Sequence, residues 1–100
     1  MSPGFEWDED KAARNIQKHG VTFTEAETAF FDQQAVIIPD PKHSDDEDRE
    51  IIFGHSDRGR LLVVSYTSRP PNLRIISARR ADPHERKQIA KHLAEGWKHE

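Results

Sequence analysis

Residues 49–80 form the most strongly patterned part of this 100-residue chain and read REIIFGHSDRGRLLVVSYTSRPPNLRIISARR. Three runs in it are rich in β-branched and aromatic residues, at Arg49–His55, Arg60–Thr67 and from Leu73 to Arg79 or Arg80. Such runs, separated by turn residues, predict consecutive strands. An antiparallel meander is therefore expected here.

Turn residues separate these runs. Asp57-Arg58-Gly59 is typical of a tight hairpin, and Pro70-Pro71-Asn72 indicates a stiffer loop. Upstream, Ala35–Ile38 predicts a fourth strand, and the acidic, proline-bearing stretch Pro39–Asp48 that follows it is expected to be mobile.

Three helices flank the strands. The first is predicted over Asp8–His19, with Asp8 as N-cap and Gly20 beyond its end, and its narrow apolar stripe suggests that it lies across a surface. In the second, Thr24 and Glu27 have capping-box spacing, and the helix is expected to end near Phe31. The apolar stripe of the first helix consists of Ala12, Ala13 and Ile16. The last helix is predicted to begin after Asp82, with Pro83 at its first position and Glu85 at the capping-box position, and to continue to about Gly96.

Together these elements predict an α+β fold with two N-terminal helices, a four-stranded antiparallel sheet and a C-terminal helix. At this length, residues 1–100 are expected to form a single domain. The chain has no cysteine, which excludes disulfides and thiolate metal sites and suits a reducing cytoplasm. Neither a signal peptide nor an apolar run long enough for a membrane span is present, so no membrane association is expected.

The two halves of the chain differ in charge. Residues 1–48 carry 4 Lys or Arg against 12 Asp or Glu, whereas residues 49–100 carry 11 against 6. The second half therefore suggests a basic surface for phosphates, although charges that simply solvate a small protein explain the count equally well.

Most of the arginines of the second half gather around one predicted strand. Strict alternation would place Arg74 and Arg80 on one face of that strand and Arg79 on the other, with Arg69 and Arg60 nearby. A guanidinium grips phosphate through two parallel hydrogen bonds and can stabilise charge at phosphorus. The alternative for each arginine is an ion pair with one of the acids of the first half.

Lys18 and His19 close the first predicted helix. Imidazole titrates near neutral pH, so His19 could move protons while Lys18 neutralises phosphate, but the helix dipole alone also favours a histidine there. Tyr66, the only tyrosine, could stack on a base or lie in the core.

No metal or cofactor site is expected. The six histidines show no ligand spacing with carboxylates, and His43, near Asp40, Asp45 and Asp46, comes nearest to one. Glycine-rich phosphate loops and cysteine nucleophiles are absent from the sequence.

Three motifs follow one another from the amino end through most of the chain. They are Phe5-Glu6-Trp7-Asp8 with Lys18-His19-Gly20-Val21-Thr22-Phe23, then Gly59-Arg60-Leu61-Leu62-Val63-Val64, and Arg74-Ile75-Ile76-Ser77-Ala78-Arg79-Arg80-Ala81 with Glu85-Arg86. In this order and spacing, the motifs resemble the BrnT family of type II toxins.

The resemblance implies a RelE-like fold and ribonuclease activity that blocks translation. It also implies a BrnA-type antitoxin, in a hetero-oligomeric complex that represses its own operon through the antitoxin's contact with operator DNA. By position, Lys18, His19, Arg74 and Arg79 match the family's basic residues, and Tyr66 and Arg69 match less closely. The tyrosine that often follows the Glu-Arg pair in this family is absent here, where Lys87-Gln88-Ile89 stands instead.

We therefore predict a metal-independent endoribonuclease that needs no cofactor and in which the substrate's own 2′-hydroxyl attacks phosphorus. Lys18, His19, Arg74, Arg79 and Tyr66 are its candidate catalytic residues, and Arg60, Arg69 and Arg80 its candidate RNA contacts. Two alternatives remain open: a module that binds nucleic acid or protein without cutting, and an inactive toxin that serves as co-repressor with its antitoxin.

Overall fold

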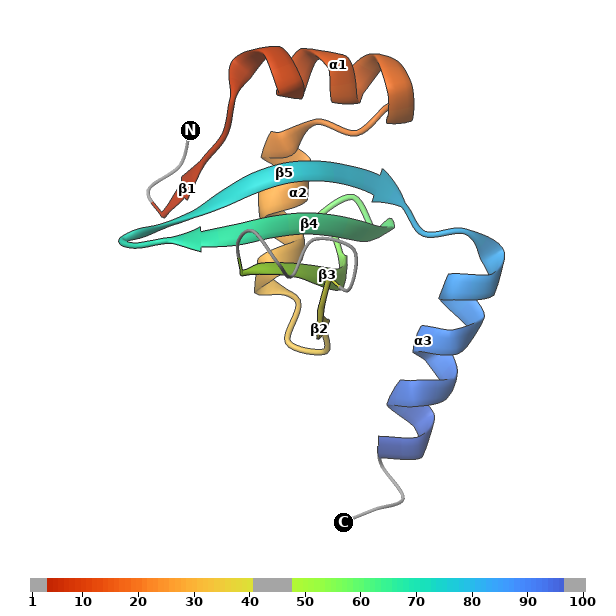
Figure 1. The fold of residues 1–100 in the computed structure, drawn as a ribbon. Coiled ribbons are helices and arrows are strands. Elements are labelled where there is room, and N and C mark those ends of the chain that lie inside the picture. The colour runs from red at the N-terminus through yellow and green to blue at the C-terminus, as the bar shows by residue number, and fades with distance from the viewer. Residues whose placement is uncertain (1–3, 41–47, 97–100) are drawn as a thin grey trace.

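The computed structural model describes residues 4–40 and 48–96 and shows an α+β domain built on one mixed sheet (Figure 1). Its strands lie in the order β1-β5-β4-β3-β2. All neighbours are antiparallel except β1 and β5, which are parallel. The strands are β1 (Phe5–Glu6), β2 (Val36–Pro39), β3 (Arg49–His55), β4 (Leu61–Arg69) and β5 (Asn72–Arg80).

The prediction of a four-stranded, fully antiparallel sheet is therefore wrong in one respect. The four predicted strands and their meander are confirmed, but β1 adds a fifth strand that pairs Phe5 with Leu73 and Glu6 with Arg74. A strand of two residues is too short to show the alternation by which strands are recognised in a sequence. Much of the predicted mobile stretch Pro39–Asp48 lies outside the described residues.

The helices are α1 (Glu9–His19), α2 (Phe23–Thr28) and α3 (Pro83–Gly96), and a short 3₁₀ turn, η1 (Ala29–Phe31), extends α2. Asp8 caps α1 as predicted, with its carboxylate accepting from the N–H groups of Asp10 and Lys11. Gly20 ends α1 with φ of 69°, in the left-handed region that glycine tolerates best.

The predicted start of the second helix was two residues too late. Thr22, not Thr24, is the N-cap, and its hydroxyl accepts from the N–H of Glu25 at 3.0 Å. Both Thr22/Glu25 and Thr24/Glu27 have capping-box spacing, so the sequence is compatible with two start positions for this helix. The earlier one buries Phe23 inside the helix, where it meets Trp7 edge to face.

Two apolar clusters lie on opposite faces of the sheet. The larger one packs α2 against β3, β4 and β5, with Phe23, Ile52, Leu62 and Ile75 almost fully buried. β3 approaches η1 so closely that a Cβ on Gly54 would stand 2.5 Å from the Ala29 carbonyl oxygen. The smaller cluster, on the other face, consists of Leu61, Val63 and Ala81 with the partly buried Ile51, Phe53 and Ile89.

The path of β5 departs from simple alternation. Ser65 pairs with Ser77 and Tyr66 with Ile75, so Ile76 is an extra residue, a β-bulge. As a result Ile75 and Ala78, three positions apart, both face the larger cluster. The prediction that Arg74 and Arg79 lie on opposite faces is therefore wrong, because the bulge turns both toward the face opposite the larger cluster.

Asn15 joins α1 to β5. Its side-chain amide donates to the carbonyl oxygens of Val21 at 2.9 Å and Ala78 at 2.8 Å, and its oxygen accepts from the N–H of Ala78 at 3.1 Å. The Asn15 amide thus makes the two hydrogen bonds to Ala78 that a neighbouring strand would otherwise make, at a point of β5 that β1 does not reach. The expected stripe of Ala12, Ala13 and Ile16 was partly wrong, since Ile16 is 48% exposed and the buried residue of α1 is Asn15.

Replacing Asn15 with alanine is expected to lower the free energy of unfolding by about 2–3 kcal/mol, because it removes the side chain that hydrogen-bonds the buried N–H and C=O of Ala78. Urea denaturation measures this. The matched control is Gln17→Ala on the exposed side of the same helix, which we expect to change stability by less than about 0.5 kcal/mol. Equal effects of the two substitutions would contradict the role given to Asn15.

Candidate functional site

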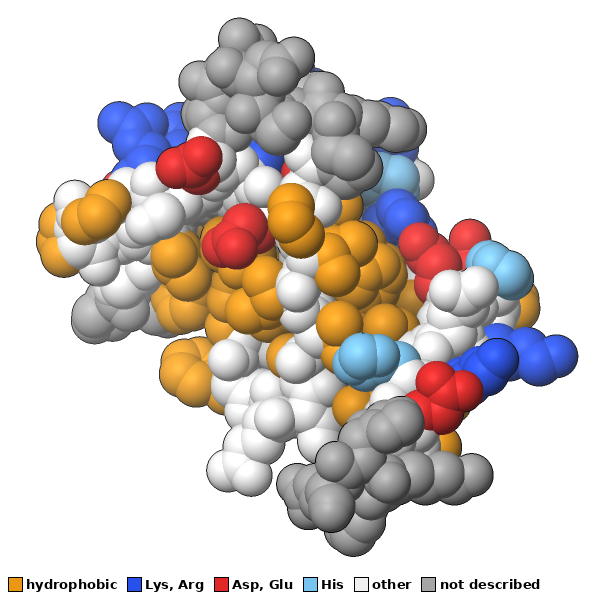
Figure 2. Space-filling view, turned by 60° about the horizontal axis from the view of Figure 1, so that its bottom comes forward, with side chains coloured by type: hydrophobic (Ala, Val, Ile, Leu, Met, Phe, Trp, Pro, Cys, Tyr) orange, Lys and Arg blue, Asp and Glu red, His pale blue; other side chains and the backbone are white. Residues whose placement is uncertain are grey.

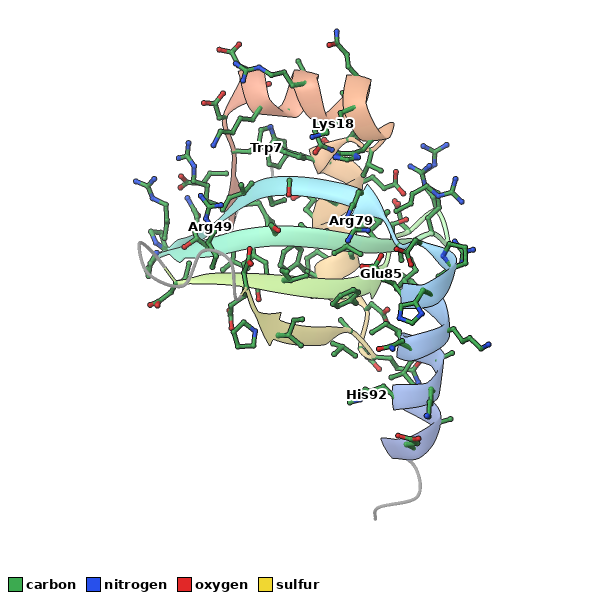
Figure 3. The ribbon with its side chains drawn as sticks, turned by 45° about the vertical axis from the view of Figure 1, so that its right-hand side comes forward. Trp7, Lys18, Arg49, Arg79, Glu85 and His92 are labelled. Atoms are coloured by element: carbon green, nitrogen blue, oxygen red, sulfur yellow. The ribbon has the colours of Figure 1, made fainter. Side chains whose placement is uncertain are left out.

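The carboxyl end of α1, the end of β5 and the start of α3 meet on one side of the molecule. Figure 3 shows Lys18 at the end of α1, Arg79 on β5 and Glu85 in the first turn of α3. The Asn15 amide sets this arrangement, since it binds the residue that precedes Arg79 and lies one turn before His19. His19, which follows Lys18, is thereby brought near Arg79, 60 positions further along the chain.

Glu85 holds Arg79 in a bidentate ion pair. The two terminal nitrogens of the guanidinium donate to the two carboxylate oxygens at 2.7 and 2.8 Å. The Arg79 side chain is still 42% exposed. Since a guanidinium has more N–H donors than this pair uses, Arg79 can be fixed in direction and still present N–H groups to a ligand.

Glu85 also builds the start of α3. Its carboxylate accepts from the Asp82 N–H at 3.0 Å, while the Asp82 carboxylate accepts from the Glu85 N–H at 2.7 Å. This reciprocal pair confirms the capping box predicted there. Hydrogen bonds from Arg79 first, and then from the Asp82 backbone, lower the pKa of Glu85 to about 2. The carboxylate is therefore charged at neutral pH and serves to position Arg79, not to transfer protons.

His19 lies half-buried beside two cations. Partial burial lowers its pKa, and the positive charges of Lys18 and then Arg79 lower it further. All three causes disfavour the imidazolium form, so the ring is neutral at pH 7 and able to accept a proton. Neutral imidazole beside a fixed guanidinium is an arrangement suited to general-base catalysis with charge stabilisation.

Arg74 lies at the far end of β5. It donates to Glu6 at 3.1 Å, an ion pair with the acidic half of the chain. Because of the bulge, Arg74 and Arg79 pair with β4 residues only four positions apart, Thr67 and Val63, which corresponds to about 13 Å. Arg69 is exposed at the end of β4, and its charge, after the hydrogen bond from Asn72, lowers the pKa of Glu6. These two arginines therefore form a separate basic area from the one at Arg79.

Two other candidates serve the fold. Arg60 makes a bidentate pair with buried Glu25, to which the Ser56 hydroxyl also donates at 2.7 Å, and this joins the β3–β4 hairpin to α2. Tyr66 is 3% exposed in the larger cluster, where its hydroxyl donates to Glu50 at 3.1 Å. Burial, followed by the charge of Glu50, raises the pKa of Tyr66 to about 12. Arg80 is exposed and pairs with Leu62 of the larger cluster, so it lies on the face opposite Arg79, and the prediction that it shares a face with Arg74 is wrong.

Glu85 is a residue of the site that was not predicted from the sequence. Its capping-box position and its place in a family motif were both visible, but neither indicated an ion pair with Arg79 across the turn between β5 and α3. The arginine pairs predicted with first-half acids do occur, at Arg60 and Arg74.

Within residues 4–40 and 48–96, no group of three or more His, Cys, Asp or Glu side chains could hold a metal ion. Of the set that came nearest to a metal site in the sequence, only Asp40 falls inside these residues. No helix in the described part of the chain is long and apolar enough to cross a membrane.

We expect NMR titration to give His19 a pKa below 6.5, and to show a higher value in Lys18→Gln and in Arg79→Gln, because each substitution removes a nearby positive charge. Arg58→Gln, in the β3–β4 turn, is the control and should leave the His19 titration unchanged. A wild-type value above 6.5 that neither substitution moves would contradict the geometry described.

Residues 7–85 match the family model described as ribonuclease toxin, BrnT, of type II toxin–antitoxin system. The curated proteins contain no significant match. Among solved structures, the 1.1 Å crystal structure of the Brucella abortus ribonuclease toxin BrnT is similar, with a TM-score of 0.62 and 27% sequence identity. The match covers 78% of this chain and 95% of that one. The chain therefore belongs to the BrnT family of type II toxin–antitoxin ribonuclease toxins.

Proposed function

We propose that this chain is an endoribonuclease whose reaction centre consists of Lys18, His19 and Arg79, and that it cleaves RNA without a metal ion and thereby inhibits translation. The observation that carries the proposal is the placement of Arg79, fixed by two bonds to Glu85 beside a histidine that is neutral at pH 7. A positioned base and an oriented guanidinium are what an intramolecular attack on phosphorus needs.

In the proposed reaction His19 accepts the proton of the substrate's 2′-hydroxyl. The 2′-oxygen bonds to the adjacent phosphorus, and the bond from phosphorus to the 5′-oxygen breaks. Lys18 or water donates a proton to the departing 5′-oxygen. The products are a 2′,3′-cyclic phosphate and a 5′-hydroxyl. Arg79 stabilises the charge that develops on the phosphoryl oxygens, and Glu85 acts as a positioning residue that keeps the guanidinium in place.

Arg74 and Arg69 then serve as contacts for the RNA backbone outside the reaction centre. The bulge at Ile76 supports this, because it turns Arg74 and Arg79 to the same face of the sheet, about 13 Å apart, where one RNA backbone can reach both. Arg80 remains a candidate backbone contact. We leave Arg60 and Tyr66 out of the proposed site, since Glu25 engages the first and the core encloses the second.

The rest of the proposal follows from membership of the family. A type II toxin has an antitoxin partner, for which a BrnA-type protein is our candidate, with the complex repressing its operon by binding operator DNA. A RelE-like relationship of the fold and a cytoplasmic site of action belong to the same proposal. The absence of cysteine supports the second.

Substituting Arg79 with alanine is expected to slow RNA cleavage by about 10²–10³-fold, through loss of charge stabilisation. The chain and its Arg79→Ala variant would be induced in bacteria without antitoxin, with growth followed and new RNA 5′ ends mapped. Arg58→Ala, an exposed arginine whose side chain is 69% accessible, is the control and should remain fully toxic.

Growth arrest with new cleavage sites, both lost in Arg79→Ala, is the expected result. Normal growth and intact RNA, with the wild-type protein folded and abundant, would overturn the ribonuclease proposal and favour a binding module or a co-repressor. Full toxicity of Arg79→Ala would remove that residue from the reaction centre.

A further inference from the structure

A groove lies between α3 and the sheet, on the face opposite the larger cluster. Its volume is about 280 Å³. Residues of β2 and β3 form its floor and residues of α3 its wall, and Figure 3 shows His92 on the side of α3 nearest the sheet. The lining residues are Val36, Ile38, Phe53, His84, Glu85, Gln88, Ile89 and His92.

The floor of this groove is apolar and partly open to solvent. Ile38 is 40% exposed, and Phe53 and Ile89 are only partly buried, against the smaller cluster. Figure 2 shows a continuous area of hydrophobic side chains on one face of the molecule, with histidines beside it. Exposed apolar surface of this kind on a small protein, bordered by polar residues, marks a place where another molecule binds.

The border of the groove is basic. A second hollow adjoins it along α3 and shares His84, Gln88 and His92, and its other lining residues are Lys87, Lys91 and Glu95. Lys87 and Lys91 are exposed, and Lys91 has an acidic neighbour on the helix, Glu95 at 3.9 Å. An apolar trough with a cationic shoulder complements a polypeptide with apolar anchors and acidic flanks.

The groove reaches the proposed reaction centre through Glu85. This side chain lines the groove and also holds Arg79 by two hydrogen bonds. A chain bound in the groove would therefore lie directly beside the arginine that is proposed to meet the scissile phosphate. Strand addition to β2 fits less well, because β2 has four residues and its Pro39 has no N–H to offer.

We infer that an acidic, amphipathic segment of the antitoxin binds in the groove between α3 and β2–β3 and excludes RNA from Arg79. This inference rests on the proposed function for its inhibitory consequence, and on membership of the toxin–antitoxin family for the partner. The binding site itself follows from the apolar floor, the basic border and the position of Glu85.

Ile37 and Ile38 provide a matched pair of variants. They are neighbours on β2 with exposures of 53% and 40%, but alternation turns Ile38 into the groove and Ile37 to the opposite face. The probe is the antitoxin encoded in the same operon as this toxin. The purified antitoxin is titrated into each toxin variant, and calorimetry measures the affinity. Ile38→Asp is expected to weaken binding at least tenfold, and Ile37→Asp by less than about twofold.

A second variant tests the charge. Lys87→Glu/Lys91→Glu is expected to weaken antitoxin binding several-fold, and added salt should reduce the difference from wild type. If Ile38→Asp is poorly folded by circular dichroism, Gln88→Trp fills the groove from an exposed helix position and is expected to have the same effect. Unchanged affinity in the folded groove variant would overturn the inference.

The proposed function is tested separately, by measuring RNA cleavage by the toxin in the absence of antitoxin. Ile38→Asp is expected to cut RNA at the wild-type rate and to resist the antitoxin. If the wild-type toxin cuts no RNA but binds the antitoxin, and Ile38→Asp abolishes that binding, the ribonuclease proposal is refuted and the proposed antitoxin site is supported. Sedimentation identifies the competing occupant, since a self-dimer lost in Ile38→Asp would place a second copy in the groove and overturn the inference.

Discussion

The arrangement of this protein depends on one buried side-chain amide. Asn15 satisfies both backbone groups of Ala78 on the edge of β5 that β1 leaves uncovered. Unpaired backbone groups at a buried edge cost free energy, so this contact fixes where α1 lies and not merely whether it packs. The helix has little apolar surface to offer, with Ile16 turned toward solvent, and its position must therefore come from hydrogen bonds. The next residue after Ala78 is Arg79, and one turn after Asn15 comes His19.

Two further devices complete the site. The bulge at Ile76 changes which residues of β5 face the larger cluster, and so turns Arg74 and Arg79 to the same side. The capping box of α3 then supplies Glu85, which stabilises the helix start and orients the Arg79 guanidinium with the same carboxylate. Because Glu85 remains charged well below neutral pH, with a pKa of about 2, the pair persists wherever the protein is folded near neutrality. The low pKa of His19 comes from the same crowding of positive charge, in addition to burial.

Much of this could be predicted from the sequence, and the failures have physical causes. The strands β2 to β5 and the caps at Asp8 and Asp82 were predictable, because they depend on local chemistry that a short window contains. The two-residue β1 and the choice of Thr22 over Thr24 depend on partners distant in the chain. The same holds for the site: Lys18, His19 and Arg79 were identified as candidates, but a bulge set by pairing with β4 was invisible to strict alternation. Tyr66 and Arg60 could not be separated from the reactive candidates until their partners Glu50 and Glu25 were known.

The account depends most on His19 and Arg79 acting together in one reaction centre, and a double-substitution cycle on RNA cleavage tests this directly. The rates of wild type, His19→Gln, Arg79→Lys and the double variant would be measured on one short RNA. Groups that act in a single step are strongly non-additive, so the double variant is predicted to be no more than about tenfold slower than the slower single variant. Effects that multiply in full would show that the two side chains act independently and would contradict a shared site.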